Sequence, residues 1–173
     1  MTKTIYLLRH AEKDDLGMLT DLGRKQASDL RSQLPSFTKV ISSESNRVQE
    51  TALLATGEQP KVDDRAGFYM ATQEKSDLLN KIAKENKISF LEAVVKLNDP
   101  EVLAGVDTKA TELNNLINET LTTMNDGESA LIASHDLSIS PAMRQRGIPL
   151  ESIPFLSGYI IDEKGNIQTF NRN

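Results

Sequence analysis

Short apolar segments alternate with segments of helical periodicity along most of this chain, and that alternation limits the fold more than any other feature. The first apolar segment combines β-branched and aromatic residues, which favours a buried strand. We predict strands at residues 3–8, 38–42, 61–63 and 130–134. Strands that alternate with helices predict an α/β fold, a three-layer sandwich whose central sheet is mainly parallel.

The segments between these strands carry start and stop signals for helices. Thr20 is the expected N-cap of the first helix, which Pro35 ends. Its expected apolar face consists of Leu22, Ala27, Leu30 and Leu34. Ser43 or Ser45 is expected to cap the helix after the second strand, and Ser89 with Glu92 predicts a capping box. The other expected helices cover residues 74–85, 89–99, 108–124 and 140–146.

The last part of the chain predicts a β-hairpin. Residues 158–161 and 166–170 are the expected strands, and Asp162-Glu163-Lys164-Gly165 is the turn between them. The hairpin would add an antiparallel edge to the sheet. The length of 173 residues suits one domain, which we place at residues 1–173 with a small helical insertion around 72–124.

Composition and charge exclude several classes of function. The net charge is -5 and basic residues form no stripe, so we expect no nucleic-acid partner. There is no apolar run of about 20 residues, so we expect no membrane partner. The N-terminal apolar segment ends too early for a secretory signal, and the chain has no cysteine; both favour a cytoplasmic location.

Polar residues follow three of the predicted strands. Arg9 and His10 follow the first, residues 43–47 follow the second, and His135 with Asp136 follows the strand at 130–134. The carboxyl ends of parallel strands share one edge of the sheet, where α/β proteins bind ligands. Taken singly, each histidine is more simply a polar residue beside the core. Two histidines at the same edge, each with charged neighbours, indicate a site.

The residue types at this edge suit a phosphoryl group. A neutral imidazole is a competent nucleophile near pH 7, with an ordinary pKa of about 6.5. Arg9 and Arg47 can clamp phosphate oxygens, because a guanidinium offers a planar fork of donors. A metal site is the alternative for His10, His135 and Asp136, although the two arginines oppose a cation. We therefore expect no metal and no cofactor.

Four segments together resemble the histidine phosphatase superfamily, also called the phosphoglycerate mutase-like or RHG family. The matching segments are residues 7–12, 19–27, 42–52 and 130–135. They follow the order of the family's motifs and span residues 3–136, with Ala11 in place of the usual glycine of Arg-His-Gly. The short chain is similar to the phosphohistidine phosphatases of the SixA type.

This resemblance implies a role for each site residue. His10 would be the phosphorylated nucleophile, and Arg9, Arg47 and His135 would hold the phosphoryl oxygens. Asp136 would be the general acid, because His135-Asp136 resembles the His-Asp pair of the acid phosphatase and phytase branch. The alternatives are that Asp136 only caps the following helix, that Glu74 is the acid, or that no acid is needed.

The leading hypothesis is a metal-independent phosphatase that acts on a small phosphomonoester or on a phosphohistidine protein. A phosphotransferase of the phosphoglycerate mutase type is one alternative. A catalytically weak binding or regulatory module for phosphorylated ligands is another. Lys13 is a weaker candidate for contact with substrate, and a solvated lysine is the alternative. Phe68, Tyr69 and Met70 are candidates for the pocket rim, although core packing explains them equally well. Ser43 and Thr51 are expected to cap or pack.

Overall fold

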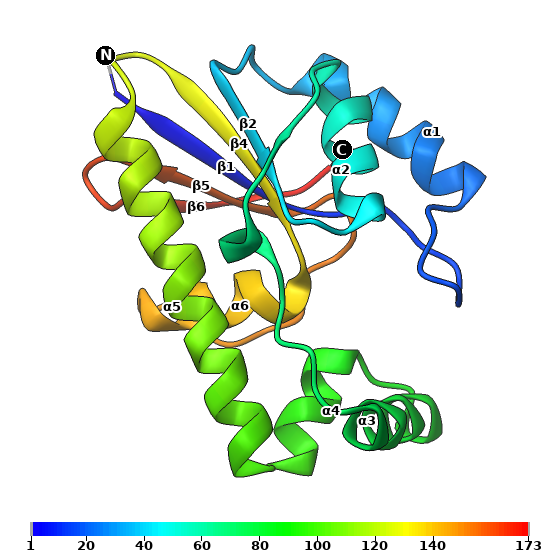
Figure 1. Cartoon of the computed structure of the whole chain (residues 1–173). Helices are drawn as coiled ribbons and strands as arrows, with labels where there is room; N and C mark the ends of the chain where they lie inside the picture. Colours follow the sequence, from blue (N-terminus) through cyan, green and yellow to red (C-terminus); the bar gives the residue numbers. More distant parts are fainter. Residues whose placement is uncertain (1, 173) are drawn as a thin grey trace.

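The computed structural model describes residues 2–172, which are built around a six-stranded sheet (Figure 1). The strands are β1 (Thr4–Arg9), β2 (Lys39–Ser42), β3 (Lys61–Val62), β4 (Ser129–Ser134), β5 (Gly158–Asp162) and β6 (Ile167–Phe170). Their order across the sheet is β3-β2-β4-β1-β5-β6. The first four in this order pair in parallel, and β5 and β6 form the antiparallel edge.

The register brings the carboxyl ends of three parallel strands to one place. Arg9 of β1 pairs with Ser134 of β4, and Ser42 of β2 pairs with Ala133 of the same strand. The residues that follow β1 and β2 therefore start on either side of the residue that follows β4, since neighbouring strands lie about 4.8 Å apart. This is the edge at which the sequence predicted a site.

Helices cover both faces of the sheet and make three layers (Figure 1). One face carries α1 (Asp21–Leu30) and α2 (Asn46–Thr56), and the other carries α5 (Pro100–Thr123) and α6 (Asp136–Gln145). The alternation along β1 supplies both cores: Ile5 and Leu7 pack with residues of α5 and α6, whereas Leu8 packs with residues of α1 and α2. Two 3-10 turns, Arg31–Gln33 and Asp64–Ala66, complete the connections on these faces. The α/β sandwich predicted from the alternating pattern is confirmed.

The helices α3 (Gln73–Asn86) and α4 (Phe90–Leu97) lie together beyond the sheet, beside the start of α5 (Figure 1). They share a separate apolar cluster with the first turns of α5, to which Leu79, Val94 and Val102 belong. Leu137 of α6 joins this cluster. The contact ties the α3–α4 pair to the helix that begins directly after β4.

Local signals placed two helix starts correctly. The Thr20 hydroxyl accepts a hydrogen bond from the Gly23 N–H and caps α1. Ser89 and Glu92 form the expected capping box at the start of α4. In contrast, Leu22 was expected on the buried face of α1 and is 53% exposed, because α1 buries Gly23, Ala27 and Leu30 instead.

Two helices begin earlier than predicted. The helix expected from residue 108 begins at Pro100, because the Asp99 side chain caps it and proline is tolerated at the first helical position. The helix expected from residue 140 begins at Asp136 and includes Pro141. At 24 residues, α5 is the longest helix described, yet no helix within residues 2–172 has the length and apolar character needed to cross a membrane.

Candidate active site

His10 lies at the point where the chain leaves β1. Its side chain is only 4% exposed, and its Nδ1 is 2.8 Å from the Ala11 carbonyl oxygen. A carbonyl can only accept, so Nδ1 carries the proton and donates. The Nε2 of His10 is therefore left with a lone pair, which accepts a hydrogen bond from Arg47 Nε at 3.3 Å. The segment after β1 is also held by α2, because the Ala11 N–H donates a hydrogen bond to the Thr51 hydroxyl at 3.0 Å.

Arg47 lies in the first turn of α2 and joins the two histidines. Its Nε contacts His10, and its Nη2 is 3.3 Å from His135 Nδ1. Side chains on a helix lean toward its N-terminus, which brings this guanidinium back over the strand ends. Two imidazoles thus share one guanidinium, and their ring centroids are 5.4 Å apart.

His135 follows β4 and is also only 4% exposed. Its Nδ1 faces the guanidinium of Arg47, which can only donate, so Nδ1 is the acceptor of this ring. Its Nε2 carries the proton and donates to the Ser43 hydroxyl at 3.0 Å. The sequence predicted only a capping or packing role for Ser43, and the contact across the sheet edge was missed because no local signal reports it.

Burial keeps both imidazoles neutral. The pKa of His10 is lowered to about 3, and desolvation by burial is the largest cause. The hydrogen bond to the Ala11 carbonyl raises this pKa, whereas the nearby charges of Arg47, Arg9 and Lys13 lower it further. Desolvation also lowers the pKa of His135 to about 2, with further lowering from His10 and the two arginines. Near pH 7 the Nε2 of His10 therefore has its lone pair, as a nucleophile requires.

These shifts predict a pH-dependent stability. In the unfolded chain both histidines gain a proton near pH 6.5, whereas in the folded chain they stay neutral until pH 3 or below. The contribution of the two neutral, buried histidines to the free energy of unfolding is therefore fully present above about pH 6.5, and it is lost as the pH falls toward 3. The free energy of unfolding should decrease by up to about 1.4 kcal/mol per pH unit for each histidine.

Urea denaturation of wild type and His10→Gln between pH 5.5 and 4.5, without phosphate in the buffer, checks this. The carboxylates titrate in both proteins, so their effect on the slope cancels when wild type and His10→Gln are compared. We expect the slope of unfolding free energy against pH to be smaller in His10→Gln by about one proton. Equal slopes would contradict a neutral, buried His10.

Arg9 is held by groups from the far end of the chain. Its Nη1 donates to the Ile153 carbonyl and lies 3.8 Å from Asp136 Oδ2, and its guanidinium stacks 4.2 Å from the centre of the Phe155 ring. Its Nε is buried and has no hydrogen-bond partner among the described residues. A buried donor without a partner costs about 1–3 kcal/mol of stability.

Asp136 is the first residue of α6, and the N-cap is His135, which makes no capping hydrogen bond through its side chain. The carboxylate of Asp136 instead accepts from Ser140, Ser152 and the Ile153 N–H. The alternative that Asp136 merely caps the helix is therefore wrong. These bonds fasten the 152–153 segment to α6 and place the carboxylate beside Arg9.

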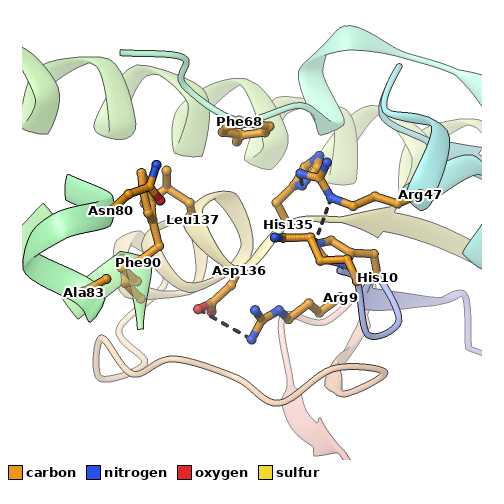
Figure 2. Close-up of a pocket in the computed structure, with 12 residues that line it drawn as sticks. Arg9, His10, Arg47, Phe68, Asn80, Ala83, Phe90, His135, Asp136 and Leu137 are labelled. Atoms are coloured by element: carbon orange, nitrogen blue, oxygen red, sulfur yellow. Dashed lines mark hydrogen bonds and ion pairs between the residues drawn. The ribbon is translucent and has the colours of Figure 1, made fainter. Parts of the chain in front are cut away.

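The five residues singled out in the sequence line one cavity of about 320 Å³: Arg9, His10, Arg47, His135 and Asp136 (Figure 2). Lys13 and Phe68 line it as well, and the Phe68 ring lies 4.6 Å from that of His135. Glu74 is exposed on α3 and does not line the cavity. Phe155, which contacts both Arg9 and His10, was not expected from the sequence.

This arrangement opposes a cation and suits an anion. Arg9 and Arg47 place two positive charges at the cavity, and both imidazoles lie beside them. Among residues 2–172 there is no group of three or more histidine or acidic side chains that could hold a metal ion. A tetrahedral oxyanion would meet the guanidinium groups of Arg9 and Arg47 next to the Nε2 of His10.

No family model and no curated protein sequence matches this chain. Solved structures do resemble it. A phosphoglycerate mutase from Bacillus anthracis str. Sterne is 19% identical with a TM-score of 0.67, and the match covers 97% of this chain and 91% of the other. YhfR of Bacillus stearothermophilus is 22% identical with a TM-score of 0.69, covering 96% and 95% of the two chains.

A third similar structure is the mycobacterial glucosyl-3-phosphoglycerate phosphatase Rv2419c. It is 15% identical with a TM-score of 0.67, and the match covers 100% of both chains. At these identities the comparison concerns the fold, which agrees over nearly the full length. The chain therefore has the phosphoglycerate mutase-like α/β fold.

Proposed function

We propose that this chain is a metal-independent phosphatase that forms a phosphohistidine intermediate on His10. One observation carries the proposal: the hydrogen bond from Nδ1 to the Ala11 carbonyl leaves the Nε2 lone pair beside Arg47 in the anion-binding cavity. The low pKa of His10 keeps that lone pair free at neutral pH. The fold, shared with structures named as a mutase and as a phosphatase, supports phosphoryl transfer.

The reaction has two steps. In the first, His10 Nε2 forms a bond to phosphorus, the bond to the ester oxygen breaks, and that oxygen leaves with the electron pair and takes up a proton. In the second, a water oxygen bonds to phosphorus and gives up one proton, which replaces the proton used in the first step. The N–P bond breaks, and its electron pair returns to Nε2. The products are the alcohol and inorganic phosphate.

Arg9, Arg47 and His135 stabilise the charge on the transferred group. Phosphoryl transfer depends mainly on positioning and on such electrostatic stabilisation. His135 can donate to a phosphoryl oxygen only from Nδ1, which requires the proton to be on that nitrogen. Ser43 permits this change, because a hydroxyl that accepts from His135 Nε2 can rotate and donate to it instead.

Asp136 is the proposed general acid. In the free protein its carboxylate accepts from its neighbours and faces Arg9 at 3.8 Å. A bound phosphate dianion would compete with Asp136 for Arg9. The proton would then pass from Asp136 to the leaving oxygen.

Asp136→Asn tests this role. We expect a loss of about 10²–10⁴-fold in kcat/KM on alkyl phosphates, which need a proton on the leaving oxygen. The loss on p-nitrophenyl phosphate should be much smaller, because p-nitrophenolate leaves without protonation. Steady-state kinetics with both substrates decide the matter: an equal loss on both would make Asp136 a positioning residue for Arg9.

The proposed function itself is tested with p-nitrophenyl phosphate in the presence of EDTA. Turnover that persists in EDTA, with a phosphoenzyme that survives alkali and is lost in acid, is the expected result. Turnover that EDTA removes would overturn metal independence. Phosphate binding without phosphoenzyme would favour the binding module, and transfer of the phosphoryl group between phosphoglycerates would favour the mutase.

A further inference from the structure

The active-site cavity has two unlike ends. Arg9, His10, Arg47 and His135 form one end, which comes from β1, α2 and the end of β4 (Figure 2). The opposite end comes from the α3–α4 insertion and the second residue of α6. Its lining residues are Asn80, Ala83, Phe90, Leu91 and Leu137, of which Asn80 alone has a polar side chain.

A second cavity of about 210 Å³ adjoins the apolar end. The two cavities share Phe68, Asn80, Phe90 and Leu137. The second one continues between α3, α4 and the 68–71 segment, and it has no charged residue in its lining. Its lining adds two further side chains with a polar group, the hydroxyls of Tyr69 and Ser76. Away from the phosphoryl end, the two adjoining cavities are therefore lined mainly by apolar side chains.

The α3–α4 wall is held firmly in place. Phe90 is the first residue of α4 and lies within the capping box that Ser89 and Glu92 form. Leu91 and Leu137 belong to the apolar cluster that joins the insertion to α6. Phe68 bridges the two ends of the cavity, with its ring 4.6 Å from the ring of His135. The wall is thus a fixed part of the site.

We infer that the phosphatase proposed above takes phosphomonoesters whose leaving group is an uncharged, apolar alcohol or phenol. The phosphoryl end supplies the cations, so the phosphate binds there and the leaving group extends toward Phe90 and Leu137. A carboxylate or polyhydroxylated leaving group would lose its hydration against a wall whose polar side chains are only those of Asn80, Ser76 and Tyr69. An alkyl or aryl group loses nothing there and gains from burial.

The test uses 4-alkylphenyl phosphates, because saturated alkyl groups change the size of the leaving group and leave the acidity of the phenol nearly constant. We expect kcat/KM to rise about fourfold for each methylene added from methyl to propyl. The charged analogue 4-(carboxymethyl)phenyl phosphate should react at least about tenfold more slowly than the propyl compound. A flat series, or a preference for the charged ester or for a phosphohistidine protein, would overturn the inference.

Phe90→Ala tests the wall directly, with Val95→Ala on the exposed face of the same helix as the matched control. Phe90→Ala should reduce the ratio of propylphenyl to phenyl phosphate kcat/KM by about fivefold or more, since it removes buried apolar surface. Inhibition by inorganic phosphate, which needs only the cationic end, should be unchanged. Val95→Ala should alter neither quantity. An unchanged ratio in a folded Phe90→Ala protein would contradict the inference.

Binding of phosphonates separates this inference from the proposed function, because phosphonates bind without turnover. Phenylphosphonate should bind the wild type at least about tenfold more tightly than methylphosphonate. If the protein prefers phenylphosphonate but hydrolyses no ester, the proposed phosphatase activity is refuted and the apolar subsite is supported. Hydrolysis with equal affinity for both phosphonates would keep the phosphatase and refute the subsite.

Discussion

Replacement of His10 by alanine is expected to reduce turnover of p-nitrophenyl phosphate by at least about 10⁴-fold, because a missing nucleophile cannot be compensated by the groups around it. The Nε2 of His10 is the nitrogen that faces Arg47 in the cavity, and the second histidine has its Nε2 bonded to Ser43. The variant should form no acid-labile phosphoenzyme. Stopped assays and phosphoenzyme trapping in EDTA measure both effects.

The fold of His10→Ala is checked separately from its activity. Removal of a buried imidazole that resists protonation leaves the core clusters on both faces of the sheet intact. Inorganic phosphate should still raise the Tm of the variant, because Arg9, Arg47 and His135 are retained. Activity within tenfold of wild type would refute the central role of His10.

Arg47→Lys is expected to lower kcat/KM by about 10²–10³-fold, the range seen when one donor to a reacting oxyanion is lost. Arg47 contacts His10 through Nε and His135 through Nη2, which are separate atoms of one planar group. Lysine keeps the charge but presents a single ammonium on a flexible stem, so it cannot make both contacts in the same geometry. Steady-state kinetics on p-nitrophenyl phosphate give the measurement.

Arg24→Lys is the matched control for Arg47→Lys. Arg24 lies on α1, where it pairs with Glu50 and Asp21 at the surface. Its replacement by lysine should leave kcat/KM within about twofold, because exposed ion pairs contribute little. An Arg47→Lys enzyme as active as Arg24→Lys would show that charge alone suffices at position 47.

Much of the site was accessible from the sequence because it depends on where strands end. An apolar run precedes each of His10, residue 43 and His135, and such a run is a local pattern that the sequence shows directly. The alternation of these strands with helices then predicts that the strands pair in parallel, as they do. Once the strands are parallel, their carboxyl ends must meet. That reasoning placed Arg9, His10, Arg47, His135 and Asp136 at one edge, and all five line one cavity.

The start of a helix was harder to predict from the sequence where the same residues could end one helix or begin the next. Pro100 was taken as the end of one helix, and it is the first residue of the next, because Asp99 caps that helix. The cap is decided by whether a side chain reaches a free N–H, which composition alone does not settle. In the same way, the start of α6 at Asp136 is fixed by contacts with Ser152 and Ile153, which follow the helix.

The sequence by itself determined the class of the fold, the edge of the sheet at which the site lies and the residue types gathered there, because periodicity and strand ends are local properties. Only the tertiary structure decided which nitrogen of His10 faces the cavity, that Ser43 supports His135 across 92 positions of the chain, and that Phe155 stacks on Arg9. It also decided that an apolar wall from α3 and α4 faces the two arginines. These features are contacts between distant segments, and they exist only once the sheet and its helical layers have packed.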